Sequence, residues 1–185
     1  MPLGQSIRGL VLAMAIPCLS NTATAQGYGA WGTDITLGGH RLAGAKEFKK
    51  GGVFADALLT GGRRISPTTH IVGGAGIGVA GNFSLNDMCT PTPSGGCEES
   101  QWFVVTSMLV GMARDLDHKT ARVLIGAAQY AGDSASVWGV QMRGDIALQI
   151  HRHFGMVPTA RVTYLPSYAG ERLFAWSLGL GISFR

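Results

Sequence analysis

Charge is scarce in this sequence. Asp, Glu, Lys and Arg together make up 14% of the 185 residues, whereas a soluble domain carries about 25%. Glycine is abundant instead, at 28 residues. The formal net charge of +4 is too small to favour nucleic acid as a partner. We therefore expect a fold with a large surface that carries no charge.

Long apolar runs are also missing. Glycine or charge interrupts every run in residues 26–185, well before the ~20 residues of a membrane-spanning helix. The N-terminal run Gly9–Leu19 is too short to span a membrane, and it follows Arg8, the only charge before Asp34. Small residues at Ala23-Thr24-Ala25 complete the pattern of a secretory signal. We predict a signal peptide over residues 1–25 and a single mature domain over residues 26–185.

Cysteine is rare. Of three cysteines, Cys18 belongs to the predicted signal, which leaves Cys89 and Cys97 around the segment T-P-T-P-S-G-G. An even number of cysteines in an exported protein favours a disulfide. We predict that Cys89 and Cys97 are bonded at the tip of a loop, and the alternative is two free thiols.

Alternation of side-chain size is strongest at the C-terminus. Residues 172–184 read RLFAWSLGLGISF, with a large apolar residue at every second position and mostly small residues between them. Successive side chains of a strand point to opposite faces. Neither face has the polar side chains that water requires, which favours a wall between lipid and a narrow, filled interior. The apolar face contains Trp176, Leu178, Leu180, Ile182 and Phe184.

Residues 137–150 alternate in the opposite sense to a soluble sheet. Trp138, Val140 and Met142 share one face, and Gln141, Arg143, Asp145 and Gln149 share the other. A secreted soluble barrel of the avidin or lipocalin type requires an apolar interior and a polar exterior. We therefore expect the apolar row to face outward and the polar row to face inward.

Eight strands follow from the two-residue period. The even number places both termini at one end of a barrel, with short periplasmic turns and longer outer loops. The predicted fold is all-β, an eight-stranded antiparallel up-and-down transmembrane β-barrel. Strands are expected at 27–38, 53–60, 70–81, 101–113, 121–131, 137–150, 156–165 and 172–184, turns at 61–69, 114–120 and 151–155, and outer loops at 39–52, 82–100, 132–136 and 167–171.

This pattern resembles the small outer-membrane barrels of the OmpA and OmpX type. The resemblance rests on Ala23-Thr24-Ala25, the alternating strands and the C-terminal strand. It implies that the last strand, with its aromatic residue Phe184, is read by the barrel assembly machinery. Arg185 follows that aromatic residue, which departs from the family pattern. Barrels of this size include adhesins, anchors, small-solute channels and lipid-modifying enzymes, so the fold does not fix the function.

Five charged residues are expected to face the lumen: Asp34, Asp56, Arg143, Asp145 and Arg161. The interior of an eight-stranded barrel is just wide enough to be filled by side chains. An unpaired charge there is costly, so we expect these residues to pair and to plug the barrel. The alternative is a narrow conducting pore.

The histidines do not form a convincing site. His40 is expected in the first outer loop without a serine neighbour, and His70 near the base of the third strand. His151 and His153 share one face of a strand, yet no third ligand completes a metal site. Lipid A deacylases and palmitoyltransferases occur among eight-stranded barrels, but we find no local signature of either, so we expect no enzymatic activity and no cofactor.

Four cations fall in the first predicted outer loop, where the phosphates of lipopolysaccharide lie: Arg41, Lys46, Lys49 and Lys50. Salt-dependent contact with those phosphates is one interpretation, and an ordinary solvated loop is the other. We expect a monomeric outer-membrane protein of a Gram-negative-type envelope that acts structurally or through its outer loops, with membrane lipid and the assembly machinery as partners. The alternatives are an enzyme that modifies lipid A and a narrow solute channel.

Overall fold

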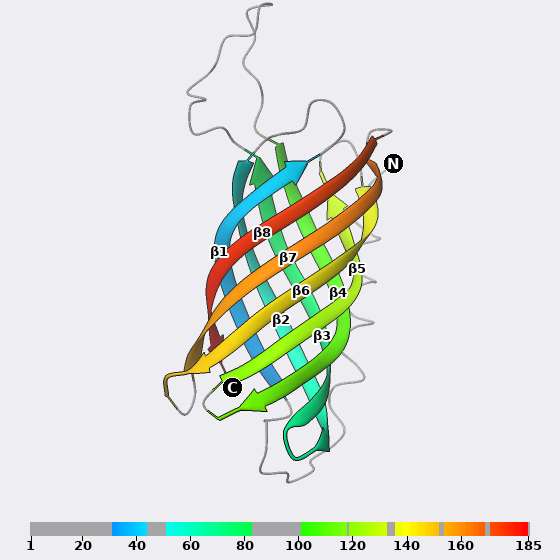
Figure 1. The fold of residues 1–185 in the computed structure, drawn as a ribbon. Helices are drawn as coiled ribbons and strands as arrows, with labels where there is room; N and C mark the ends of the chain where they lie inside the picture. The colour runs from blue at the N-terminus through cyan, green and yellow to red at the C-terminus, as the bar shows by residue number, and fades with distance from the viewer. Residues whose placement is uncertain are drawn as a thin grey trace, which may run out of the picture.

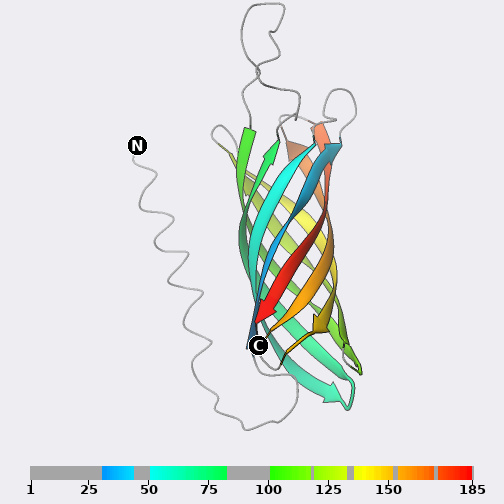
Figure 2. The same ribbon diagram turned by 90° about the vertical axis from the view of Figure 1, so that its left-hand side faces the viewer.

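The computed structural model describes residues 31–43, 51–82, 101–117, 119–132, 136–151, 154–168 and 171–184. These residues form one closed barrel, in which each strand pairs antiparallel with its neighbours in sequence and the last strand pairs with the first (Figures 1 and 2). The predicted fold class is confirmed. The strands are β1 (Trp31–Ala43), β2 (Gly51–Ser66), β3 (Thr69–Asn82), β4 (Gln101–Leu116), β5 (Lys119–Ala131), β6 (Ser136–Gln149), β7 (Phe154–Tyr168) and β8 (Glu171–Phe184).

Several predicted connections are wrong because the strands run further than their apolar alternation. The predicted turn 61–69 shrinks to residues 67–68, and the turn 114–120 shrinks to residues 117–118. Likewise, β1 and β2 extend into the predicted loop 39–52, and β7 and β8 extend into the predicted loop 167–171. The reason is the ladder of backbone hydrogen bonds, which continues through polar and glycine residues as long as a neighbouring strand lies alongside.

The two ends of the barrel differ in their connections. At one end, which we call the turn end, Thr33 near the start of β1 lies opposite Phe184 at the end of β8, and the strands are joined at 67–68, 117–118 and 150–153. Asp117 has a φ of 52°, which a two-residue hairpin turn favours. The opposite end, the loop end, has connections at 44–50, 83–100, 132–135 and 169–170, and the first two are longer than any connection at the turn end. Outer-membrane barrels place short turns in the periplasm and long loops outside.

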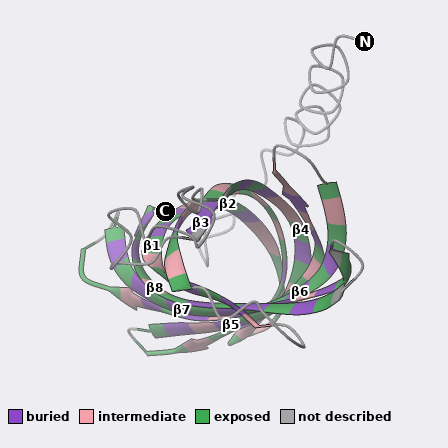
Figure 3. Cartoon of the chain, turned by 90° about the horizontal axis from the view of Figure 1, so that it is seen from above, coloured by how far each residue is buried: buried purple, intermediate pink, exposed green. Residues whose placement is uncertain are grey.

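Burial alternates along the strands (Figure 3). The exposed positions are mostly large apolar residues, and the buried side chains fill the interior. On β6 the predicted faces are confirmed for most of the strand: Trp138, Val140 and Met142 are exposed, whereas Gln141 and Arg143 are buried. Gln149, which we also predicted to be in the inward row, is instead exposed, because β6 ends there at the turn end. None of the described residues forms a helix long and apolar enough to cross a membrane.

Aromatic side chains lie near both ends of the exterior. Near the loop end they are Trp102, Trp138, Phe174 and Trp176, and near the turn end they are Phe154 and Phe184. Girdles of aromatic residues at the two membrane interfaces are typical of transmembrane barrels. The surface between them is the band that faces the hydrocarbon core.

Small residues at the seam between β1 and β8 make room in the interior. Gly38 lies opposite Gly179, where the first and last strands pair. A Cβ atom on Gly179 would lie 2.7 Å from Cζ of Phe54, so the missing side chain leaves the space that this aromatic ring fills. The inner glycine row predicted on β3, Gly74, Gly76 and Gly78, is also observed among partly buried positions.

Candidate functional site

A chain of ion pairs crosses the lumen between the turn end and the middle of the strands. It is built from three arginines and three aspartates that alternate in the order Asp34, Arg122, Asp145, Arg143, Asp56, Arg161. Strands β1, β2, β5, β6 and β7 each contribute at least one of these residues. The six formal charges sum to zero, so the buried arginines and aspartates neutralise one another without water.

Arg122 holds the turn-end part of the chain. Its Nη2 donates to Oδ2 of Asp34 at 2.6 Å, and its Nε donates to Oδ1 of Asp145. The side chains of Arg122 and both aspartates are at most 1% exposed. One guanidinium therefore bridges carboxylates from β1 and β6, and its planar donor geometry suits that double contact.

Arg143 and Arg161 hold the other part. Arg143 donates from Nε to Asp145 at 3.1 Å and from Nη1 to Asp56 at 2.8 Å. Arg161 donates from Nη1 to the same oxygen of Asp56 at 3.0 Å. A further donation from Nη2 of Arg143 reaches the hydroxyl of Thr36 at 3.3 Å. The network thus ties β6 and β7 to the facing strands β1 and β2.

All five charges predicted for the lumen take part in this chain. Arg122, which pairs with both Asp34 and Asp145 near the turn end, was not among the residues predicted for the lumen. Its position offered a signal, because Arg122 alternates with the outward residues Val123 and Ile125 and so belongs to the inner face of β5. Because Arg122 lies near the start of β5, the sequence is equally consistent with an ordinary cation at the membrane interface.

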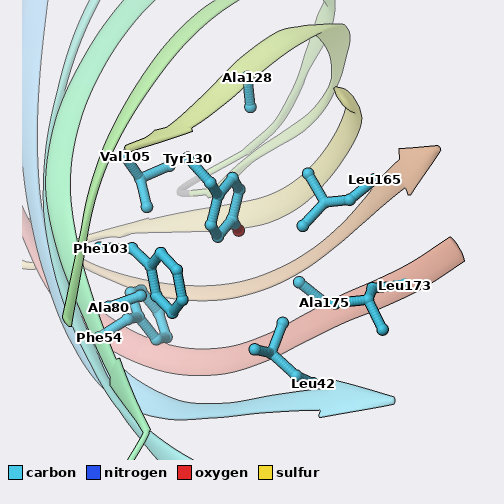
Figure 4. Close-up of a cluster of buried hydrophobic side chains, with 10 residues drawn as sticks. All are labelled: Leu42, Phe54, Ala80, Phe103, Val105, Ala128, Tyr130, Leu165, Leu173 and Ala175. Atoms are coloured by element: carbon cyan, nitrogen blue, oxygen red, sulfur yellow. The ribbon is translucent and has the colours of Figure 1, made fainter. Parts of the chain in front are cut away.

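An apolar cluster fills the lumen between the ion pairs and the loop end (Figure 4). Phe54, Phe103 and Tyr130 provide its aromatic part, and the guanidinium carbon of Arg161 lies 4.4 Å from the centroid of the Phe54 ring. Each residue is less than 5% exposed. The cluster consists of Leu42, Phe54, Ala80, Phe103, Val105, Ala128, Tyr130, Leu165, Leu173 and Ala175.

A smaller polar group lies at the turn end of the lumen. His70 is buried on β3, and its Nε2 lies 2.8 Å from Oδ2 of Asp115 on β4. Thr120 on β5 donates its hydroxyl hydrogen to the other oxygen of Asp115 at 3.0 Å. These contacts join three neighbouring strands where they leave the barrel. His70 lies near the base of its strand, as predicted.

Two predictions about His40 are wrong. It lies on β1 rather than in an outer loop, and it has a serine neighbour, because its Nδ1 is 3.0 Å from Oγ of Ser177 directly opposite on β8. Arg161 donates to the same hydroxyl at 3.4 Å. His40 and Ser177 are 3% and 1% exposed and point into the lumen. A histidine beside a serine is the first element of a nucleophilic site, but this pair faces away from lipid.

The remaining predicted site residues divide into described and undescribed positions. Arg41 is exposed on β1, not in a loop, and lies opposite Trp176 on β8. The predicted signal peptide, Lys46, Lys49 and Lys50, and the cysteines Cys89 and Cys97 lie outside the described residues. His151 is exposed and stacks on Phe154 at 5.5 Å, and His153 is not described. Within the described part of the chain, no group of three His, Cys, Asp or Glu residues is arranged to hold a metal ion.

Comparison with known proteins shows the fold and no nearer relationship. No protein-family model and no characterised protein matches the sequence. The structure is similar to neisserial surface protein A (NspA), with a TM-score of 0.55 and 11% identity over 86% of this chain and 99% of NspA. Ail, the attachment invasion locus protein of Yersinia pestis, gives 0.46 and 15% over 83% and 98%. The N-terminal barrel domain of Pseudomonas aeruginosa OprF gives 0.46 and 10% over 83% and 97%.

At this low identity, the likeness to NspA shows a shared fold alone. The TM-scores of Ail and OprF are lower still, so we conclude nothing from those two likenesses. The exterior and the interior of the chain agree with that fold. Closed barrels are the form in which β-structure crosses a membrane, and the exposed apolar band is suited to lipid. The chain is a small eight-stranded β-barrel with the fold of outer-membrane barrels.

Proposed function

We propose that this protein is a plugged outer-membrane barrel that acts as a structural or interaction protein through the segments at its loop end. Its lumen neither conducts solutes nor catalyses a reaction. The main evidence is the chain of ion pairs from Asp34 to Arg161. These side chains occupy the lumen of a barrel that is only wide enough for side chains, so they leave no room for a solute.

Two features of the lumen, the apolar cluster and the chain of ion pairs, favour a plugged barrel rather than a channel. A narrow solute pathway needs an open polar route from one end to the other, and the apolar cluster that includes Phe54, Phe103 and Tyr130 lies across the loop-end half of the lumen. Beneath it, every guanidinium of the ion-pair chain is at most 4% exposed. In a water-filled channel, these cations would instead be exposed to water.

Conductance measured together with stability tests this proposal. We expect no steady conductance from the native barrel in a planar lipid bilayer. The substitution Arg143→Ala leaves Asp145 and Asp56 with fewer partners and lowers the free energy of unfolding by about 3–5 kcal/mol, still without conductance, because the apolar cluster stays in place. Arg41→Ala, at an exposed position, is the control and leaves both quantities near native. Steady, ion-selective conductance of the native protein contradicts the plug.

Contact with lipopolysaccharide is a second function that the loop end supports. Arg41 points outward beside Trp176, and Arg172 is exposed four residues before Trp176 on the outward face of β8, nearer the loop end. Lys46, Lys49 and Lys50 follow β1 in the sequence. Cations at this height suit the phosphates of the outer leaflet.

Binding of purified protein to lipopolysaccharide tests this second function. We expect binding to weaken as salt is added, because exposed charges are screened, and to weaken in the double variant Arg41→Gln, Arg172→Gln. The control removes two cations at the turn end instead, with Arg63→Gln and Arg114→Gln. Binding that ignores salt, or that falls equally in both variants, contradicts the assignment to the loop end.

The proposed lack of catalysis has its own test. His40 and Ser177 face the lumen, where lipid A has no access from the membrane. Lipid A incubated with the native barrel should be recovered unmodified. Removal of an acyl chain by the native protein, lost in the Ser177→Ala variant, would instead establish an enzyme.

A further inference from the structure

Three cations point outward at the turn end of the barrel. They are Arg63 on β2, Arg114 on β4 and Lys119 on β5, and all three are exposed. The outward direction follows from their neighbours, because Arg63 lies opposite the exposed Ile71, and the chain neighbours Ala113 and Thr120 are buried. We call these three residues the turn-end basic cluster.

The strand register brings the three cations together. Arg114 lies opposite Thr69 on one side and Ala121 on the other, so Lys119, two residues from Ala121, is its diagonal neighbour. Diagonal neighbours lie ~7–8 Å apart. Arg63 lies opposite Ile71, two residues from Thr69, so two strand spacings and two residues along the strand separate it from Arg114, or ~12 Å. Arg114 lies between the other two cations, and its long side chain can share one anionic group with either of them.

The described residues leave this cluster largely unneutralised. Asp115 points inward and is bonded to His70 and Thr120. Within the described ranges, Arg63, Arg114 and Lys119 make no ion pair, and Asp117 in the β4–β5 turn is the one exposed carboxylate nearby. Like charges on neighbouring strands repel one another, so an added anion stabilises the arrangement.

A fourth cation nearby has a different role. Arg64 donates from Nε to the carbonyl oxygen of Ser66 at 3.0 Å and from Nη2 to that of Pro67 at 2.5 Å. Its guanidinium therefore holds the β2–β3 turn in shape. Arg64 serves the local backbone, whereas the turn-end basic cluster faces the membrane.

The surface next to the cluster is apolar. Ile71, Met112 and Val123 lie side by side on β3, β4 and β5, and each is about half exposed. A ligand that touches both surfaces needs a negative head and an apolar tail. We propose that the turn-end basic cluster binds the headgroup phosphate of an anionic phospholipid, with the acyl chains against these three residues.

This assignment rests on the outer-membrane placement, since the turn end then meets the inner, phospholipid leaflet. A basic patch near a membrane surface attracts anionic lipid with a free energy that grows with each Lys or Arg. A peptide or a periplasmic protein fits less well, because the three side chains point toward lipid rather than along the barrel axis.

Native mass spectrometry of the folded barrel in detergent tests the proposal, with phosphatidylglycerol and phosphatidylcholine as probes. We expect the native protein to retain phosphatidylglycerol in preference to phosphatidylcholine. Each cation removed lowers the affinity for phosphatidylglycerol about fivefold, so the triple variant Arg63→Gln, Arg114→Gln, Lys119→Gln loses the preference. The control Arg41→Gln, Arg172→Gln, at the loop end, retains it.

The detergent assay does not depend on the proposed lack of conductance or catalysis, so its failure would leave the proposed function unaffected. A heat-modifiable band on an unboiled gel shows that each variant is folded. Equal retention of the two lipids by the native protein overturns the proposal. Native-like preference in the triple variant overturns it as well, as does an equal loss in the loop-end control, which would show attraction to net charge rather than to this cluster.

Discussion

Phe154 and Phe184 lie directly opposite each other where β7 and β8 pair at the turn end. Both rings point outward and are exposed to similar extents, 44% and 47%. The two residues therefore share one environment but belong to different strands. Only Phe184 lies in the last strand, for which we predicted a role as the assembly signal together with Trp176, Leu178, Leu180 and Ile182.

Phe184→Ala should lower the amount of folded barrel that reaches the outer membrane, because the assembly machinery loses the aromatic residue that it reads. Phe154→Ala removes the same ring from the facing strand and should leave that amount near native. The measurement is the heat-modifiable band in membrane fractions from cells that express each variant. Equal losses in both variants would mean that the ring matters for the membrane interface and not for recognition.

Arg122→Ala should lower the free energy of unfolding by about 3–5 kcal/mol. The substitution leaves the buried carboxylate of Asp34 without its guanidinium, and uncompensated buried charge is costly. Urea unfolding of the barrel in lipid vesicles measures the change. Arg63→Ala is the control, because that arginine is exposed on β2, and should change the stability by no more than about 0.5 kcal/mol.

The double variant Asp34→Ala, Arg122→Ala sharpens this prediction. Removal of both partners should cost less than the sum of the single substitutions, since no lone charge remains at that position. Additive losses would show that the two side chains contribute independently.

Gly126→Ala should destabilise the barrel by about 1–3 kcal/mol. A Cβ atom at this inward position would lie 2.9 Å from Cα of Leu109 and closer still to the carbonyl oxygen of Met108. Gly144→Ala is the control, because a Cβ atom there meets nothing within 4 Å, and should leave the stability within about 0.5 kcal/mol of native. The same unfolding measurement compares both, and equal effects would contradict the steric reason.

The predicted disulfide between Cys89 and Cys97 lies outside the described residues and remains a proposal. Thiol titration of denatured, unreduced protein should find no reactive thiol in these two residues. The variant Cys89→Ser, Cys97→Ser should lose about 2–3 kcal/mol of stability, while reduced native protein loses a similar amount. Two reactive thiols in the unreduced protein would contradict the bond.

The faces of the strands were predictable because a two-residue period needs few assumptions. Once Trp138 and Met142 are placed outward, Gln141, Arg143 and Asp145 must point inward. The same reasoning placed Asp34, Asp56 and Arg161 in the lumen. Which aspartate pairs with which arginine was not predictable, because that depends on the curvature of the barrel and on the relative heights of strands that are far apart in sequence.

The errors concern residues near the ends of strands. Gly38 and Gly39 before His40 indicate a turn, yet β1 continues to Ala43 because β8 lies alongside as far as Phe174. His40 thereby enters the lumen and meets Ser177, 137 residues later in the chain. A short apolar alternation marks the middle of a membrane strand, whereas the partner strand sets its length.

The contact between Arg122 and Asp34 has a consequence for how the barrel closes. Their strands, β5 and β1, are four positions apart in the order of the sheet, which is ~19 Å in a flat sheet. The two charges meet only when the sheet has curved into a cylinder. In an open sheet Arg122 would still face Asp145 on the neighbouring strand β6, but Asp34 would be an isolated carboxylate facing lipid, and isolated charge in a membrane is expensive. Half-closed forms that expose Asp34 are therefore disfavoured relative to the finished barrel, so the lumen charges favour complete closure.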